Sequence, residues 1–203
     1  MNAHRVITEE DLRTVPPGSS IHVPEDAILT PSARDLAAAR GIAILRVSRQ
    51  AQEDVVALGA DHGGFEMKET IKYVLAELGL RHHDFGTYST DPVDYPDFAQ
   101  AVAESVSTGR FRRGIIVDGA GIGSCMVANK VPGVRAAMCY DVATARNSRE
   151  HNDANVLTVG AKMISLEAMR EVVKTWLTTP VGEERHRRRV EKIMGVERKY
   201  LAR

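Results

Sequence analysis

The sequence has no excess of charge of either sign, because 27 lysine and arginine residues balance 27 aspartate and glutamate residues. Zero net charge gives no general attraction to nucleic acid or to a membrane surface. No segment approaches the roughly 20 apolar residues that span a bilayer. The first residues are polar and acidic, where a secretory signal would be basic and then apolar. These absences predict a soluble intracellular protein that binds neither nucleic acid nor membrane.

Cysteine is scarce as well. Cys125 and Cys139 form no CxxC pair and no disulfide framework, which fits a reducing cytoplasm. The seven histidines lack HxH, HExxH or paired Cys/His spacing, so the sequence does not predict a metal site. We therefore expect a cytoplasmic protein that works without a metal or another cofactor.

From Val55 onward, apolar strand-like runs alternate with helical patterns. Such alternation indicates right-handed βαβ units and a parallel sheet covered on both faces. We predict a Rossmann-like three-layer α/β/α domain over residues 51–203, with a five-stranded parallel sheet. The expected strands cover 55–60, 81–84, 114–118, 134–139 and 156–160, and the expected helices cover 65–78, 124–130, 142–150 and 166–177.

Residues 1–50 differ in pattern and are predicted to form a small α+β accessory module. Short strands are expected at 21–23, 27–29 and 42–47. A helix should begin at Thr30-Pro31, with threonine as N-cap and proline at its first position, and should end at Gly41. We expect this helix to expose Leu36 for docking, and the module to have too little apolar surface for a robust core. The polar residues 48–54 are interpreted as a linker.

A glycine-rich turn is the most informative feature of the main domain. An apolar run ends at Asp118 and opens into Gly119-Ala120-Gly121-Ile122-Gly123. Glycines let backbone N–H groups turn toward a common point, and the start of a helix adds positive potential there. The turn therefore predicts a site for a phosphate or for a negative charge that develops in a reaction. The alternative is a loop that uses glycine only for tight turning.

Two further segments lie where ligands of open α/β sheets bind, just after strands. In one, His62 could bind phosphate or move a proton, and Asp61 could hold a sugar hydroxyl. The alternative is that Asp61 caps the following helix and His62 is solvated. In the long loop 86–97, Tyr95 could close over a ligand or could anchor the loop by packing.

The last candidates lie at helix ends. His151 could be a general acid–base group or a cation favoured by the helix dipole. Arg185 and Arg189 are four residues apart on one helical face, which suits a phosphate dianion. A solvated basic face or an RNA-binding stripe is the alternative for this arginine run. The zero net charge and the lack of an aromatic stacking platform disfavour RNA.

Over about residues 54–198 the order of these elements resembles the ribose/galactose isomerase family, which includes the type B ribose-5-phosphate isomerases. The resemblance implies a metal-free aldose–ketose isomerase that acts through an enediolate, with ribose 5-phosphate and ribulose 5-phosphate as the expected pair. It also implies a homodimer or homotetramer whose sites are shared between subunits. The matching segments are 61–64, 94–96, 119–123, 128–130, 133–136, 148–152, 155–157, 185–186 and 189–190.

The resemblance also implies roles for individual residues. His151, with Asp61, would assist ring opening, and the N–H groups of residues 119–124 would form an oxyanion hole. Arg185, Arg189 and His62 would hold the phosphate, so that its binding energy positions the reacting carbons. The full set of expected substrate contacts is His62, Tyr95, Gly119, Ala120, Gly121, Gly123, Ser124, Asn152, Arg185 and Arg189.

The chain departs from the family at the position of the base. Many members have a cysteine where this chain has Asp118, and others have a glutamate where it has Ser124. A carboxylate is a competent base for carbon acids, so we predict Asp118 as the base and Cys125 as the second choice. An aspartate at 118 also resembles one subunit type of the galactose-6-phosphate isomerases. A six-carbon (galactose or allose 6-phosphate) isomerase, or a non-catalytic sugar-phosphate-binding or assembly subunit, therefore remains an alternative.

The N-terminal module has a resemblance of its own. Residues 7–13, 27–31 and 33–35 are similar to segments of enzymes of bacterial microcompartments. This similarity implies an element that docks the protein, within the cytoplasm, on a microcompartment shell or on a neighbouring pathway enzyme. The alternative is an arm that packs on the dimer.

Overall fold

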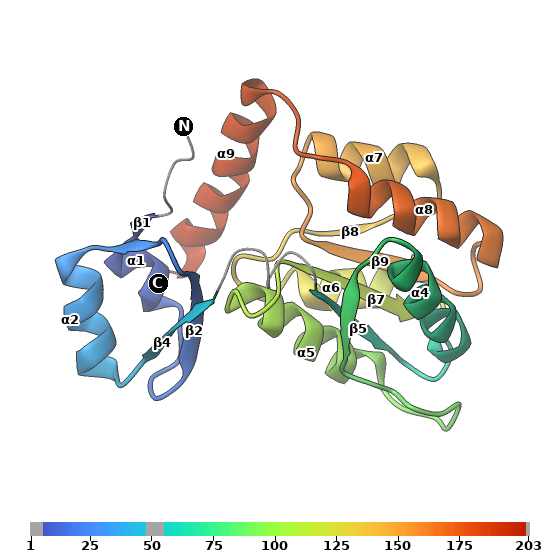
Figure 1. The fold of residues 1–203 in the computed structure, drawn as a ribbon, viewed down its shortest axis with the longest axis horizontal. Helices are drawn as coiled ribbons and strands as arrows, with labels where there is room; N and C mark the ends of the chain where they lie inside the picture. Colours follow the sequence, from blue (N-terminus) through green and yellow to red (C-terminus); the bar gives the residue numbers. More distant parts are fainter. Residues whose placement is uncertain (1–5, 48–54, 202–203) are drawn as a thin grey trace.

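The computed structural model describes residues 6–47 and 55–201, so the predicted linker at 48–54 lies outside the described residues. The main domain contains a five-stranded, all-parallel sheet in the order β6-β5-β7-β9-β8 (Figure 1). This confirms the predicted sheet. Its strands are β5 (Val55–Ala60), β6 (Arg81–Asp84), β7 (Arg113–Asp118), β8 (Ala136–Met138) and β9 (Val156–Gly160).

Helices cover both faces of the sheet (Figure 1). One face carries α4 (Phe65–Glu77), α7 (Val142–Glu150) and α8 (Leu166–Thr178), and the other carries α5 (Tyr95–Ser107) and α6 (Ile122–Ala128). Successive residues of a strand point to opposite faces. Ile115 and Val117 accordingly pack with α4 and α8, whereas Ile116 packs with α5. The central strands β5, β7 and β9 are buried on both sides, which is why they are continuous apolar runs in the sequence, whereas the edge strand β6 is polar.

The order of the strands creates one switch point, between β5 and β7. From β5 the chain moves to β6 on one side, and it then returns through α5 to β7 on the other side. Ligands of open α/β sheets bind in the crevice that such a reversal leaves at the carboxyl ends of the strands. Asp61 follows β5 and Asp118 ends β7, so both carboxylates lie at this crevice.

Two predicted features of the main domain need correction. Helix α5 was not predicted, and the loop expected at 86–97 ends at Asp94. The proline at the start of α5 and the buried Ala99, Val102, Ala103 and Val106 at helical spacing were the signals for it. Helix α6 begins at Ile122, two residues before the predicted start, because Gly121 with φ of 79° serves as its N-cap.

The N-terminal module consists of two short parallel strand pairs and two helices. Strands β1 (Val6–Ile7) and β3 (Ile28–Leu29) pair, as do β2 (Ser20–Pro24) and β4 (Ala43–Val47), and the helices are α1 (Glu9–Arg13) and α2 (Pro31–Arg40). The module buries a larger apolar cluster than we expected. Leu36 packs against this cluster, so the prediction that it is exposed for docking was wrong. The buried members are Ile7, Leu12, Val15, Ile21, Val23, Ala27, Leu29, Ala33, Ala37 and Ile42.

The module contacts the main domain at the end of α5. The N–H of His22 donates to the carbonyl of Thr108 at 2.8 Å. Gly109 has φ of 73°, and a Cβ at this position would lie 2.4 Å from the carbonyl oxygen of His22. Helix α5 ends near the beginning of β7, so the module lies at the edge of the sheet opposite Asp61 and Asp118. The described residues of the module, 6–47, therefore lie away from the crevice.

The last helix, α9 (Glu184–Leu201), extends from the main domain toward the module (Figure 1). Its Glu197 accepts the N–H of Gly133 at 2.9 Å, and its Arg198 lies 4.0 Å from Glu10 of the module. Among residues 6–47 and 55–201, no helix combines the length and the apolar character that crossing a membrane requires.

Candidate active site

The glycine-rich turn binds an anion in this structure, and that anion is the carboxylate of Asp118. Asp118 is 4% exposed. Its Oδ1 accepts the N–H groups of Ala120, at 2.8 Å, and of Gly121. Its Oδ2 accepts the N–H of Ser124, at 3.1 Å, and the hydroxyl of the same serine. The turn therefore gathers its donors on a side chain of its own, and the predicted site for a phosphate or a developing charge stays a prediction.

Half of the N–H groups that were expected to form an oxyanion hole, those of Ala120, Gly121 and Ser124, therefore donate to Asp118 instead. The N–H groups of Gly119, Ile122 and Gly123 are the ones in this turn that have no partner in the part of the chain that the structure describes. Ile122 and Gly123 are the first two residues of α6, where the helix dipole favours negative charge, and Gly119 follows β7.

Three side chains hold the turn in shape. The hydroxyl of Tyr140 donates to the carbonyl of Ala120 at 3.0 Å, and the buried hydroxyl of Thr158 donates to the carbonyl of Gly121 at 2.9 Å. The ring of Tyr95 packs on Gly123, where a Cβ would lie 2.6 Å from the nearest ring atom. The sequence did not indicate Tyr140 or Thr158, because no motif marks a residue whose partner is set by the tertiary fold. Tyr95 thus packs at the turn, and a contact of Tyr95 with a ligand stays a prediction.

Asp61 and His62 lie next to the turn. Asp61 is 8% exposed, and its Oδ1 accepts the N–H of Gly64 at 2.9 Å, so it caps the start of α4. Burial raises the pKa of its carboxyl, the Gly64 hydrogen bond opposes this, and the charge of Asp118 raises the pKa further. His62 is exposed, and its Nδ1 lies 3.2 Å from the N–H of Val93. The capping role and a role at a sugar hydroxyl are compatible for Asp61.

Cys125, the second candidate base, is half-buried one turn into α6. Its Sγ lies 3.5 Å from the carbonyl oxygen of Ala136. Burial raises the pKa of its thiol. The thiolate is the form that accepts a proton, and it is therefore rare at neutral pH. This chemistry favours Asp118 over Cys125 as the base.

A second group of predicted residues surrounds His151. The His151 ring stacks on that of His186, with ring centres 4.1 Å apart and an angle of 7° between the planes. Its Nδ1 lies 3.1 Å from the side-chain nitrogen of Asn147. Arg185 forms an ion pair with Glu183 at 2.9 Å, and Arg189 is exposed one turn further along α9. Asn152 is exposed beside His151.

His186 was predicted only as part of the family motif, and the structure gives it a specific place. It is 5% exposed, and its Nδ1 has no hydrogen-bond partner among the described residues. Burial lowers the pKa of its imidazole, and His151, Arg185 and Arg189 lower it further. The lowered pKa favours the uncharged ring, whose flat face stacks on that of His151.

The two groups lie at opposite edges of the sheet. The segment that follows His151 leads into the beginning of β9, at Val156, which pairs with Gly114. Asp118 pairs with Gly160 at the other end of β9. Four strand steps of about 3.3 Å separate these ends by about 13 Å. One chain therefore brings Asp61, His62, Tyr95, Asp118, Gly119, Ala120, Gly121, Gly123, Ser124 and Cys125 together at one edge, and His151, Asn152, Arg185 and Arg189 at the other.

Within residues 6–47 and 55–201, no three or more histidine, cysteine, aspartate or glutamate side chains are grouped so that they could hold a metal ion. The arrangement instead offers buried carboxylates, backbone N–H donors and guanidinium groups. Such groups move protons, stabilise oxyanions and bind phosphate.

Comparisons with known proteins point to the same chemistry. Residues 56–193 match a family model described as Ribose/Galactose Isomerase. The chain is 40% identical to ribose-5-phosphate isomerase B of Escherichia coli (strain K12), over 71% of this chain and 97% of that protein. It is 39% identical to D-erythrulose-4-phosphate isomerase of Pectobacterium atrosepticum, over 68% of this chain and 91% of that protein.

A solved structure agrees with these sequence matches. The fold is similar to that of ribose-5-phosphate isomerase B of Clostridium thermocellum, with a TM-score of 0.70 and 45% identity. The similarity covers 72% of this chain and 99% of that chain. The family model begins at residue 56, so the N-terminal module lies outside it.

Proposed function

The chain belongs to the ribose/galactose isomerase family, and we propose that it interconverts ribose 5-phosphate and ribulose 5-phosphate. The match to Escherichia coli ribose-5-phosphate isomerase B over 97% of that protein carries this proposal. The position of Asp118 and the glycine-rich turn at the switch point of the sheet supports it, because aldose–ketose isomerisation needs a base beside oxyanion donors.

In the proposed reaction Asp118 moves a proton between C1 and C2 of the open sugar. Oδ2 is the oxygen better able to accept this proton. One of the two hydrogen bonds that it accepts comes from the hydroxyl of Ser124, which can rotate. Rotation of the Ser124 hydroxyl would free a lone pair of Oδ2 for the substrate. The N–H groups of Gly119, Ile122 and Gly123 would then donate to the enediolate oxygen.

In this proposal Asp61 exchanges protons with the oxygen atoms of the sugar. Its raised pKa keeps the carboxyl protonated to a higher pH than an ordinary aspartate. A protonated Asp61 beside the turn can donate to the ring oxygen as the ring opens. His151 would accept the proton that the C1 hydroxyl loses as the ring opens, and no metal or cofactor takes part in the proposed steps.

The remaining contacts would come from a second copy of the chain. The segment after His151 joins β9 at Val156, about 13 Å along the strand from the end that pairs with Asp118, so we place His151, Asn152, Arg185 and Arg189 at the opposite end of the sheet. A site that uses both groups therefore has to be completed across a subunit interface. Arg185 and Arg189 of one copy and His62 of the other would hold the phosphate, and Tyr95 and Asn152 would contact hydroxyls.

A shorter substrate is the second candidate. The relative from Pectobacterium atrosepticum is a D-erythrulose-4-phosphate isomerase, and its 39% identity is nearly equal to that of the Escherichia coli relative. The purified protein should be assayed with four-, five- and six-carbon sugar phosphates in parallel. The highest kcat/KM with ribose 5-phosphate supports the proposal. No isomerisation of any of the three would favour a non-catalytic sugar-phosphate-binding subunit.

For the N-terminal module we keep docking as the proposed role, on a microcompartment shell or on a pathway enzyme. The module lies at the edge opposite Asp118, and Val6, Ile28 and Leu45 are about half exposed on its strands. Deleting residues 1–50 should leave turnover similar and should change oligomer size or co-purification with a partner. Aggregation or complete loss of activity in the truncated protein would show that the module belongs to the structural core.

A further inference from the structure

The loop that carries His151 contains an unusual backbone conformation. Asp153 has φ of 45°, and it is the one non-glycine residue with positive φ in the described part of the chain. Side chains disfavour this left-handed region, although aspartate and asparagine enter it more readily than most residues. Such a conformation persists only where the surroundings impose it, and it is common at functional sites.

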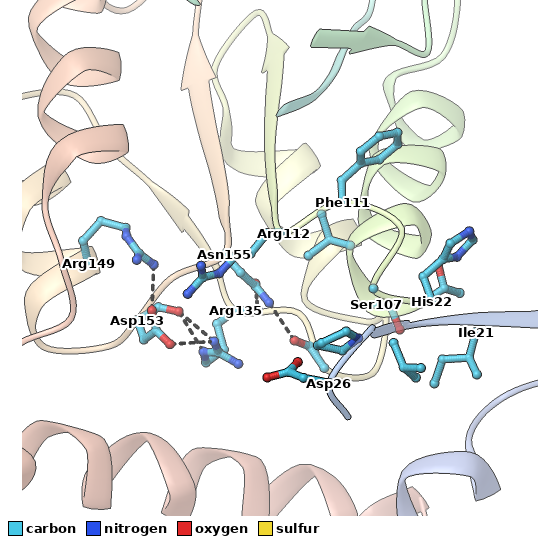
Figure 2. A pocket seen from close by; sticks show the side chains of 16 residues that line it. Ile21, His22, Asp26, Ser107, Phe111, Arg112, Arg135, Arg149, Asp153 and Asn155 are labelled. Carbon is cyan, nitrogen blue, oxygen red and sulfur yellow. Dashed lines mark hydrogen bonds and ion pairs between the residues drawn. The ribbon is translucent and has the colours of Figure 1, made fainter. Parts of the chain in front are cut away.

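Two arginines impose it here. Nη1 of Arg149 donates to Oδ1 of Asp153 at 2.8 Å and also to the carbonyl of Ala154. Nε and Nη2 of Arg135 donate to the main-chain carbonyl of Asp153, at 3.0 and 2.8 Å, and Nη2 also lies 3.3 Å from Oδ2. Figure 2 shows both arginines converging on Asp153. All three oxygens of Asp153 are therefore held, by residues from two different elements.

The arginines are themselves fixed. Arg149 is 6% exposed on the last turn of α7, and its guanidinium lies 5.5 Å from the centre of the Trp176 ring. Arg135 precedes β8, and its N–H donates to the side chain of Asn155 at 2.7 Å. The N–H of Asn155 donates back to the carbonyl of Arg135 at 3.1 Å. The clamp is thus anchored in the hydrophobic core and in the sheet.

Very little freedom remains for His151. It is the C-cap of α7, and its N–H still donates to the carbonyl of Asn147 at 2.9 Å. Between that bond and the clamped Asp153 there is only Asn152. The ring is additionally held by its stack on His186.

We propose that Asp153 is a positioning residue, which acts through Arg135 and Arg149 to hold His151 in place for the substrate bound mainly by the second subunit. The inference rests on the proposed function, in which His151 assists ring opening. The clamp matters because His151 must act across a subunit interface, on a substrate that lies in the crevice of the other copy. A backbone that is already held in position preorganises His151 for this contact.

The first test compares three substitutions at Asp153. Asp153→Ala should lower kcat about 10–100-fold, the scale of a displacement of about 1 Å, and should leave KM within about twofold. Asp153→Asn should restore most of kcat, because asparagine adopts the same backbone conformation and keeps an acceptor oxygen. Asp153→Gly permits the conformation but loses both ion pairs, so its kcat should be as low as that of the alanine variant. A wild-type kcat for Asp153→Gly would overturn the role of the clamp.

Asp141→Ala is the matched control for a loss of stability alone. Asp141 caps the other end of α7, where it accepts the N–H of Thr144 at 2.7 Å, and it does not contact the clamp. This variant should lower Tm and leave kcat unchanged. A kcat loss in Asp141→Ala as large as that in Asp153→Ala would mean that any weakening of α7 reduces activity, and the positioning role would be overturned.

A double-mutant cycle asks whether Asp153 acts through His151. In the His151→Ala background, Asp153→Ala should reduce kcat by less than about twofold further, because the group it positions is already gone. A full multiplicative loss would overturn the proposal. If His151→Ala alone leaves kcat unchanged, the role of His151 in the proposed function fails as well. If His151→Ala lowers kcat as expected but Asp153→Ala keeps the wild-type kcat, only the positioning role is refuted.

Should the alanine variant not fold, Asp153→Asn and Asp153→Gly decide the question between them. A second readout is the ¹H–¹⁵N correlation spectrum of the histidine side chains. The His151 resonances should shift or broaden in Asp153→Gly and should stay in place in Asp153→Asn and Asp141→Ala. Unchanged His151 resonances in Asp153→Gly would contradict the proposal.

Discussion

Replacing Asp118 by asparagine tests the centre of the proposed site. The substitution keeps size and shape but removes the charge and one acceptor oxygen. The amide oxygen can take over the role of Oδ1 and accept the N–H groups of Ala120 and Gly121. The amide nitrogen then faces Ser124, where Oδ2 accepted two hydrogen bonds in the original protein.

The two bonds from Ser124 respond differently. Its hydroxyl can rotate and accept from the new amide nitrogen, so that bond is replaced. Its backbone N–H cannot change, and it is left facing another donor in a buried place. An unsatisfied buried donor costs about 1–3 kcal/mol. For a chain of this size 1 kcal/mol corresponds to roughly 2–4 °C, so Tm should fall by several degrees while the protein remains folded.

The expected effect on activity is much larger than this stability loss. Losing an acid–base group typically costs about 10²–10⁴-fold, so kcat of Asp118→Asn should fall at least about a hundredfold. The Ki of inorganic phosphate as a competitive inhibitor should stay close to that of the original protein, because Arg185, Arg189 and His62 are unchanged. Turnover per folded molecule, with Tm measured on the same preparation, separates the two effects.

Ser124→Ala is the matched control. It removes the hydroxyl but keeps the N–H on Oδ2, so Asp118 retains its charge and three of its donors. We expect a modest change in kcat. Near-normal turnover in Asp118→Asn, together with the lower Tm, would show that Asp118 only fills the turn. The base would then be Cys125 or another group.

Three further predictions follow from other contacts. Arg189→Ala should weaken sugar-phosphate binding by roughly 1.5–3 kcal/mol in a titration and should barely change binding of the free sugar, whereas equal losses would give this arginine another role. Gly109→Ala should make the module more sensitive to protease than Gly79→Ala does, because both glycines have positive φ but only Gly109 faces a carbonyl oxygen at 2.4 Å. The raised pKa of Asp61 means that ionisation of its carboxyl destabilises the folded state relative to the unfolded state. Asp61→Asn cannot ionise, so it should be more stable than the wild-type protein at neutral pH. That difference should vanish below the ordinary value of 3.8, as denaturation at two pH values would show; an advantage that persists in acid contradicts it.

The sequence predicted the sheet well because of how parallel sheets are built. Strands β5, β7 and β9 are buried on both faces, so each is a continuous apolar run bounded by glycine or polar residues. By contrast, β1 was not predicted, because its two residues are too few to show any period, whereas β3 lies within the strand predicted at 27–29. Helix α5 was not predicted, because the proline at its start is as typical of a loop as of the first turn of a helix.

Some residues of the candidate site could likewise be predicted from the sequence, and others could not. Asp61, Asp118 and the glycine-rich turn could be predicted because each follows a strand and because glycine marks a special backbone. The partners that Asp118 would find could not be predicted, since its contact with Ser124 depends on the path of the turn. The clamp on Asp153 was equally hidden, because Arg135 and Arg149 meet it only after β8, α7 and β9 have packed.

The contact between Asp118 and Ser124 also explains how the chain can depart from both family patterns and still have a carboxylate at this point, the proposed base. The resemblance places a cysteine base at position 118 in many members and a glutamate base at position 124 in others. In this structure the two positions share hydrogen bonds, so side chains from either side of the turn reach the same point. Ser124 is fully buried, which leaves no room for a second long acidic side chain. A carboxylate at position 118 therefore requires a small residue at position 124. The two positions together supply one side chain that reaches this point of the turn.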